Sequence, residues 1–304
     1  MTDKLIDVWN IDTFDAALLA ELQAGEKVLR GYMITEKKNF LEYIECITVG
    51  RWQPRKSNSH ASAYQDFVER IIMPAMEKRT IRAWHYTRLT DAEAALLRTE
   101  GIYISTLETI RMRLDMQISE GLLSAHAADA LYAASPFHEQ NDVRSNRFWM
   151  TSHPLPIDDG GVTLLLENWG GEGVYFWLQD VDLIELVKRI GRPRVIELAI
   201  PLSATNRPYV AAKAVVATFG LTLGCEPEKN AFDLYSMQAL GPETVLNIHT
   251  EGDPNFVALA RGYPASFALG KEPTRRTTPT FPPLGKRHAQ TLQNLMLLWR
   301  RRQT

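Results

Sequence analysis

Two short stretches hold the residues of this chain whose types and spacing best suit chemistry: Trp84-His85-Tyr86-Thr87 and residues 171–176. Each is a β-branched or aromatic run that predicts a β-strand, with His85 at the end of the first and Tyr175 on the second. Taken alone, a histidine or tyrosine on an apolar strand more often serves packing than catalysis. Together, and in this order, they predict a His and a Tyr that face one cleft.

The elements around these two residues are short and irregularly spaced. A capping box at Thr90-Asp91-Ala92-Glu93 begins a helix that ends before Gly101. The patterns predict strands at 80–86, 102–105, 147–151, 173–178, 194–200, 215–221, 234–240 and 245–249, and further helices at 108–120, 124–134, 162–167 and 182–189. Because a single crossover helix rarely separates the strands, the sequence predicts an α+β domain and not a doubly wound parallel sheet.

The two ends of the chain differ from this strand-rich middle. Residues 12–25, 36–46 and 63–78 have helical patterns, with Asp12 or Thr13 as the first cap. Residues 270–285 are rich in proline and threonine, and residues 289–302 have the pattern of a helix with a basic end. We therefore expect an N-terminal helical segment (1–78), a strand-rich domain (79–269), a linker (270–288) and a basic C-terminal helix (289–304).

Several motifs resemble the ADP-ribosyltransferase superfamily. His-Tyr-Thr at 85–87, the Leu-Leu pair at 96–97 and Gly-Ile at 101–102 are similar to the first strand, helix and glycine step of that fold. Glu-Gly-Val-Tyr-Phe at 172–176 is similar to the strand of poly-ADP-ribose polymerases that carries the tyrosine of a His-Tyr-Glu triad. The resemblance implies a split, mixed β-sheet core, with helices added at the N-terminus, an inserted helical segment and a C-terminal helix.

The resemblance also implies a site that takes NAD as a substrate. His85 would hydrogen-bond a ribose hydroxyl, and Tyr175 would pack against the cationic nicotinamide ring. The backbone of Tyr86 and the hydroxyl of Thr87 would hold the carboxamide. Two further rings belong to the implied cofactor site, namely Trp149 and Phe176.

The third member of the implied triad is a glutamate, and three positions are open. Cleavage of the nicotinamide–ribose bond develops positive charge on the ribose, so the site needs a carboxylate nearby. Glu243 is favoured because it stands at the entry to a β-branched run. Glu172 precedes the strand predicted around Tyr175, and Glu197 lies in the middle of a strand whose apolar residues point the other way.

Two features of the sequence depart from the pattern of the family. Tyr86 stands where the family has a glycine, which is tolerated only if its backbone still faces the ligand. The interval from His85 to Tyr175 is also much longer than in the polymerases. Two helices and a flap must therefore be inserted between the two strands.

Composition limits the class of protein. With 45% hydrophobic and 23% charged residues the chain has the composition of a soluble globular protein, and no apolar run approaches the length of a membrane span. The chain has only two cysteines, and neither these nor its histidines have the spacing of metal ligands, so we expect a cytoplasmic protein without a metal. Residues 271–304 contain eight basic residues and one acidic residue. Their formal charge is therefore +7, and that of residues 1–270 is −9.

These observations lead to one expected function and one alternative. The resemblance implies a transferase that moves ADP-ribose from NAD to a protein or nucleic-acid acceptor, by analogy a toxin or a phage-defence effector. The basic C-terminal helix would contact nucleic acid or pack on its own body. The alternative is a non-catalytic sensor of the same fold that recognises NAD or an ADP-ribose derivative.

Overall fold

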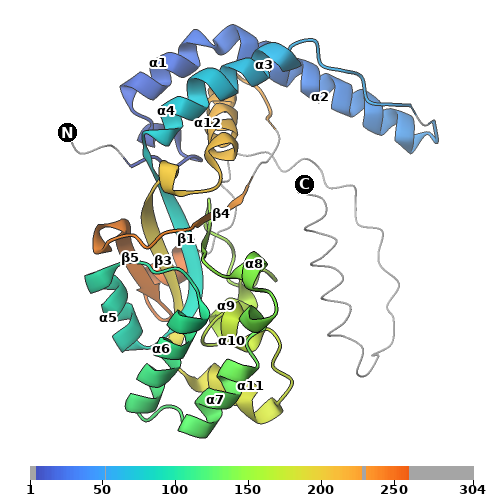
Figure 1. The fold of residues 1–304 in the computed structure, drawn as a ribbon. Helices are drawn as coiled ribbons and strands as arrows, with labels where there is room; N and C mark the ends of the chain where they lie inside the picture. Colours follow the sequence, from blue (N-terminus) through green and yellow to red (C-terminus); the bar gives the residue numbers. More distant parts are fainter. Residues whose placement is uncertain (1–4, 52, 228–230, 260–304) are drawn as a thin grey trace. The chain divides into compact units, whose positions relative to one another are not determined.

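In a computed structural model of the chain, the structure describes residues 5–51, 53–227 and 231–259. It is an α+β structure built on a five-stranded sheet (Figure 1). The strands are β1 (Thr80–Leu89), β2 (Phe148–Thr151), β3 (Arg192–Pro201), β4 (Asp233–Ser236) and β5 (Val245–Thr250), in the order β4-β2-β1-β3-β5. All neighbouring strands pair antiparallel, so the expectation of a mixed sheet was wrong. In the described part of the chain, a parallel contact occurs at the isolated bridge between Ile6 and Ile81.

Strand β1 is the axis of the sheet and is paired very differently on its two sides. On one side all ten of its residues pair with β3, from Thr80 opposite Pro201 to Leu89 opposite Arg192. On the other side β2 pairs at one position, Trp84 opposite Thr151. Within the described residues, no strand therefore pairs with the β2 side of β1 from His85 to Leu89. We call the place where the two strands diverge the β1–β2 split.

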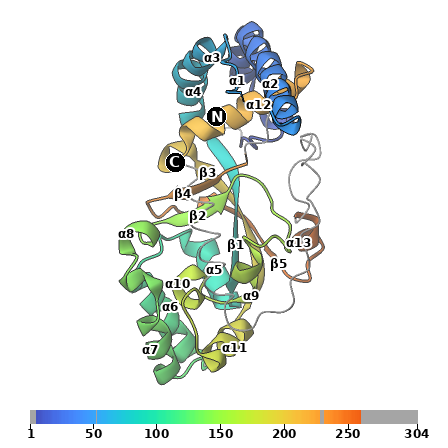
Figure 2. The ribbon, with the colours of Figure 1, turned by 90° about the vertical axis from the view of Figure 1, so that its right-hand side faces the viewer.

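The N-terminal helices and one later helix pack together at one end of β1 and β3 (Figure 2). The group consists of η1 (Ile11–Thr13), α1 (Ala16–Ala24), α2 (Glu26–Thr48), α3 (Ala61–Phe67), the π-helical turn η2 (Val68–Ile72), α4 (Met73–Glu77) and α12 (Pro208–Thr222), and β3 is followed by the turn η4 (Leu202–Ala204). The predicted helices in this region are confirmed, except that Asp15, and not Asp12 or Thr13, caps α1 by accepting a hydrogen bond from the Leu18 amide.

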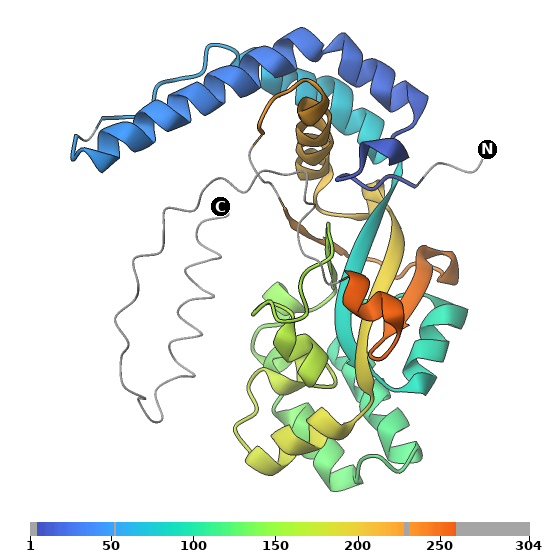
Figure 3. The ribbon, with the colours of Figure 1, turned by 180° about the vertical axis from the view of Figure 1, so that it is seen from behind.

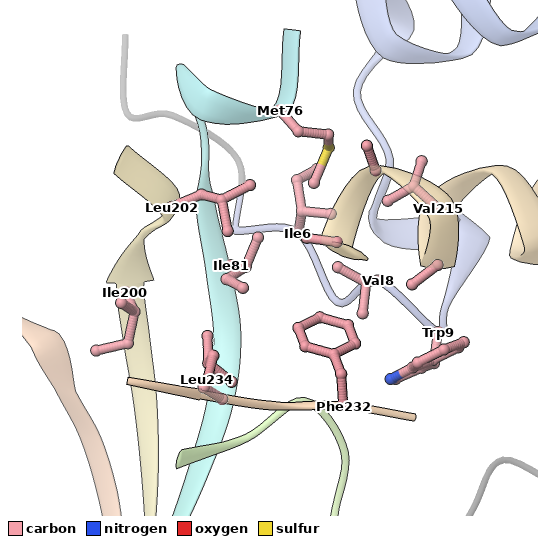
Figure 4. Packing of buried hydrophobic residues seen from close by; sticks show 14 of the residues in the cluster. Ile6, Val8, Trp9, Met76, Ile81, Ile200, Leu202, Val215, Phe232 and Leu234 are labelled. Carbon is pink, nitrogen blue, oxygen red and sulfur yellow. The ribbon is translucent and has the colours of Figure 1, made fainter. Parts of the chain in front are cut away.

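A single hydrophobic core joins this helical group to the sheet. Figure 4 shows Ile6 and Val8 of the N-terminal segment beside Met76 of α4, Ile81 of β1 and Val215 of α12. The predicted segment 1–78 thus shares its core with the strand-rich region that follows it.

A second group of helices lies at the other end of β1 and β3 (Figure 2). It comprises α5 (Asp91–Glu100), α6 (Leu107–Ser119), α7 (Ala125–Ala133), η3 (Pro136–His138), α8 (Asn141–Arg144), α10 (Glu172–Tyr175) and α11 (Val181–Arg189). The predicted capping box is present, because Thr90 and Glu93 bond each other's backbone amides at the start of α5. Helices α9 (Thr163–Glu167) and α13 (Pro254–Leu259) cover the face of β1 that carries Trp84 and Tyr86, and η5 (Pro242–Thr244) precedes β5.

Two predicted strands are helices. Residues 215–221 belong to α12, which begins with Pro208 at its first turn and is buried nearly all round, so its apolar run is that of a buried helix. The segment around Tyr175 is not a strand either. Gly170 and Gly171 have φ of 88° and 62°, and the turn they make leads into α10, where the Tyr175 amide donates to the Gly171 carbonyl.

The chain divides into two units, residues 1–268 and 269–304. The predicted linker 270–288 and basic helix 289–304 lie outside the described residues. Among the residues that are described, no helix is both long and apolar enough to span a lipid bilayer.

Candidate functional site

His85 lies at the β1–β2 split. Its side chain is on the same face of β1 as Ala83, and its ring lies 4.5 Å from the ring of Phe148 on β2. Its Nδ1 is 2.8 Å from the carbonyl oxygen of Trp149. Because a carbonyl only accepts, Nδ1 carries the proton in this contact and Nε2 of the neutral ring presents a lone pair. Within the described residues, no hydrogen bond to Nε2 is recorded.

The surroundings of His85 keep its ring neutral. Burial lowers the pKa of the imidazole from 6.5 to about 4, the hydrogen bond to Trp149 opposes this shift, and the charge of Arg113 adds to it. The residue as a whole is nevertheless only partly buried. At neutral pH, Nε2 of His85 can therefore accept a hydrogen bond from a hydroxyl group. Nε2 carries no proton that it could donate.

A buried ion pair lies behind His85. The Nε of Arg113 on α6 is 2.7 Å from one carboxylate oxygen of Glu93 on α5, and the indole nitrogen of Trp169 donates to the other at 2.8 Å. The Thr90 amide donates to this second oxygen as well. The guanidinium also lies 4.9 Å from the centre of the Trp169 ring. Two donors and the charge of Arg113 thus hold the Glu93 carboxylate, which is 3% exposed.

Polar groups on α6 are left without partners in this region. Among the described residues, Nη2 of Arg113 has no hydrogen-bond partner although it is buried. Both amide atoms of Gln117, one helical turn further along, are also buried and unpaired. A buried donor of this kind costs free energy unless a ligand or water completes it. The Arg113 guanidinium is therefore suited to an anionic or carbonyl group that enters near His85.

An exposed aromatic ledge lies on β2 and β4, on the face of the sheet opposite the His85 side chain. Trp149 and Tyr235 are opposite each other in the register, and their rings pack edge to face with centres 4.7 Å apart. The Arg147 guanidinium lies 4.7 Å from the centre of the Tyr235 ring and 5.9 Å from that of Trp149. The Trp149 side chain is 39% exposed. Rings and a cation in this arrangement suit a flat heterocycle, such as a nucleobase.

Tyr86 and Thr87 follow His85 on β1 but point in opposite directions. The Tyr86 hydroxyl accepts from the Leu155 amide at 2.6 Å, on the far face from His85, and burial raises the pKa of this phenol to about 12. The Tyr86 side chain is thus hydrogen-bonded to the loop before α9. Thr87 is on the same face as His85 and is buried. The Tyr86 backbone lies on β1 beyond Trp84, the last β1 residue that pairs with β2.

Tyr175 and Phe176 are positioned by α10 in the second helical group, and no strand carries them. Tyr175 packs against the cluster that contains Ile110 and Trp169, and burial followed by the Glu172 charge raises the pKa of its phenol. The Phe176 ring lies 4.2 Å from the Arg144 guanidinium. No contact of either ring with His85 is recorded in the described part of the chain. The predicted pair of adjacent strands carrying His85 and Tyr175 is therefore absent there.

The three candidate glutamates also lie apart from His85. Glu243 is exposed on η5, and Glu172 forms an ion pair with Arg144. Glu197 is on the opposite face of the sheet, where its carboxylate lies 3.1 Å from Arg82 Nε and 3.2 Å from His249 Nε2. None of the three has a recorded contact with His85 among the described residues.

Arg113 contributes to the site. From the sequence, Arg111 and Arg113 point different ways on one helix, where one could reach a pyrophosphate but both are expected to face solvent. The structure buries Arg113 and leaves Arg111 in exposed ion pairs with two aspartates of α6 and α7. Asp233, at the start of β4, is on the same face as Trp149 and thus opposite His85, and desolvation by the surrounding protein raises the pKa of its carboxyl, with Arg207 opposing the shift. A signal for Arg113 existed, because Arg113, Gln117, Ile110 and Leu114 share one helical face.

The described residues contain no group of three or more His, Cys, Asp or Glu side chains that could hold a metal ion. No family model, no curated protein and no solved structure matches the chain.

Proposed function

We propose that this chain binds NAD at the β1–β2 split and transfers its ADP-ribose to a macromolecular acceptor. The observation that carries the proposal is His85 at the split, with Nδ1 bound to the Trp149 carbonyl and Nε2 presenting a lone pair. The motif at 85–87 resembles the ADP-ribosyltransferases, and its histidine lies on the central strand where β2 diverges from β1.

The groups around His85 match the parts of a dinucleotide. The Nε2 lone pair accepts from a ribose hydroxyl, and the free Nη2 of Arg113 suits a phosphate or carboxamide oxygen. In the transfer, the bond between ribose C1′ and the nicotinamide nitrogen breaks, and neutral nicotinamide leaves with the bonding pair. The acceptor atom bonds C1′ and loses its proton to solvent.

The carboxylate that would stabilise the cationic ribose is the open part of this proposal. Glu243 is exposed on η5, and Asp233 lies on the β2–β4 ledge, on the face of the sheet opposite His85. We test Glu243 as the acid that the resemblance implies and Asp233 as an acid on the other face.

The test is to incubate the full chain with NAD and to measure nicotinamide release by chromatography and NAD binding by calorimetry. We expect His85→Ala to lose both, because it removes the Nε2 acceptor. His249→Ala is the matched control, since this ring is also partly buried and hydrogen-bonded but lies on β5 beside Glu197. A wild-type chain that neither binds NAD nor releases nicotinamide would overturn the proposal.

The variants Asp233→Asn and Glu243→Gln identify the acid. Loss of nicotinamide release with unchanged NAD binding assigns the catalytic carboxylate to the substituted position. If both variants keep the wild-type rate, neither acid takes part in the reaction.

A second candidate function is recognition of NAD or an ADP-ribose derivative without turnover. It is favoured by the positions of Glu172, Glu197 and Glu243, none of which has a recorded contact with His85 in the described residues. Under this function NAD binding depends on His85 while the wild-type chain releases no nicotinamide. The same pair of measurements therefore distinguishes the two functions.

A further inference from the structure

The outer half of α2 carries an apolar surface that nothing in the described structure covers. In Figure 3 this helix runs out beyond the other helices of its group, accompanied by the segment that returns from its end. Ile34 and Leu41 are each 54% exposed, and Ile44 and Ile47 are exposed as well. Exposed aliphatic side chains this close together are typical of an interaction surface.

These residues form a stripe along one side of the helix. With about 100° between successive residues, Ile34, Leu41 and Ile44 fall within an arc of about 80°, and Ile47 borders it. The stripe is about 20 Å long at 1.5 Å per residue. We call it the α2 stripe.

The returning segment packs on the side of α2 away from Ile34, Leu41 and Ile44, and its Arg55 contacts Phe40 and Glu36 at the border beside Ile47. Asn39 donates from its side chain to the carbonyls of Lys56 and Ser57. Glu42 pairs with Lys56, and Gln53 contacts Cys46. On the helical wheel Asn39, Glu42 and Cys46 lie across the axis from Leu41 and Ile44.

A groove runs along the stripe on the side of α12. Ile34, Leu41, Lys38 and Glu45 line it together with the turn at residues 224–226. The lining also includes Glu42 and Lys37, and Lys37 pairs with Glu226, so the groove has apolar walls and charged side chains of both signs. Side chains of a second helix fit this arrangement, because apolar knobs can enter between Ile34 and Leu41.

The charges along the stripe indicate which helix this is. Lys38 and Glu45 are one heptad apart on the same border, and both are exposed. Lys38 is 4.0 Å from Glu42, and no ion pair of Glu45 is recorded among the described residues. When two copies of α2 lie antiparallel, Lys38 of each copy comes next to Glu45 of the other. The stripe is therefore complementary to itself.

We propose that the α2 stripe is the interface of a homodimer in which α2 packs antiparallel against α2 of a second copy. Acids and bases nearly balance along residues 34–49, which carry Glu36, Lys37, Lys38, Glu42 and Glu45. A nearly neutral apolar surface does not attract a nucleic acid and suits a like surface. The proposal is independent of the function proposed for the β1–β2 split.

The first test measures the mass of the full chain in solution by sedimentation equilibrium at concentrations up to about 100 µM. We expect a dimer for the wild type and a monomer for Leu41→Glu/Ile44→Glu, with the dissociation constant raised at least about tenfold. Val181→Glu is the matched control, since Val181 is also strongly exposed but lies on α11, and this variant should remain dimeric. A monomeric wild type, or a double variant that still dimerises, overturns the proposal.

The second test examines the pairing of charges between copies. Lys38→Glu and Glu45→Lys each place like charges together and should each weaken the dimer. A mixture of the two single variants should form a heterodimer, because the acid introduced in one copy then meets the base introduced in the other. If mixing restores no association, the antiparallel arrangement is wrong, even if a dimer exists.

Discussion

His85 differs from the other candidate residues because its surroundings fix its protonation state. Its pKa lies at about 4 in the folded chain and its reference value is 6.5, so the unfolded chain binds the proton first as the pH falls. The contribution of His85 to stability is therefore complete above pH 6.5 and is lost as the pH falls toward 4.

The variant His85→Gln tests this account, because glutamine does not titrate. Between pH 7 and pH 4 we expect the wild type to lose about 1–3 kcal/mol more of its free energy of unfolding than the variant loses. Urea denaturation at several pH values measures the difference. Parallel pH profiles for the two proteins would show that His85 titrates normally.

The ion pair between Glu93 and Arg113 makes a second prediction about single residues. Arg113→Met leaves the Glu93 carboxylate buried without its charge partner, and we expect a loss of about 3–5 kcal/mol in the free energy of unfolding. Arg111→Met removes exposed ion pairs from the same helix and should cost no more than about 1 kcal/mol. Chemical denaturation of both variants measures this contrast, and equal losses would contradict the difference in burial.

At the scale of elements, the sequence predicted those whose pattern or punctuation is local. The capping box of α5, the strand at Arg194 and the helix at Asp182 all appear in the structure. The pattern was ambiguous where a run is apolar on every side. Residues 215–221 are such a run, and their length and β-branched content alone do not separate a buried helix from a buried strand.

The candidate site was harder to predict than the elements. His85 was placed correctly on a strand, whereas Tyr175 was placed on one by analogy, and the turn at Gly170 and Gly171 makes it helical. Arg113 could not be assigned to the site from the sequence, because its burial depends on where α5 and Trp169 pack. Contacts between distant segments determine these positions.

The glycine that ends α5 gives a prediction at this scale. Gly101 has φ of 89°, and a Cβ there would collide with the Leu240 carbonyl oxygen, to which the Ile102 amide donates. We expect Gly101→Ala to lower the free energy of unfolding by at least about 3 kcal/mol, since strain in the left-handed region adds to the collision. Gly121→Ala has a similar φ of 73° with open space around it, and should cost only about 1–2 kcal/mol. Thermal denaturation of both variants separates the collision from the backbone strain.

At the scale of the whole described structure, the helices that precede β1 are part of the same core as the sheet. Met76 of α4 and Ile81 of β1 are fully buried in one cluster, and the Thr218 hydroxyl of α12 donates to the Val8 carbonyl at 2.6 Å. A core shared in this way couples the unfolding of its parts. The N-terminal helices and the sheet should therefore unfold together.

The variant Met76→Ala tests this coupling. It removes a fully buried side chain, so we expect a loss of about 2–5 kcal/mol in the free energy of unfolding. Ile71→Ala, at an exposed position in the preceding π-helical turn, is the control and should cost less than about 1 kcal/mol. Helical circular dichroism and tryptophan fluorescence should report one transition, shifted equally by Met76→Ala. If the helical and the fluorescence transitions separate in Met76→Ala, the segment 1–78 unfolds as a unit separate from the sheet.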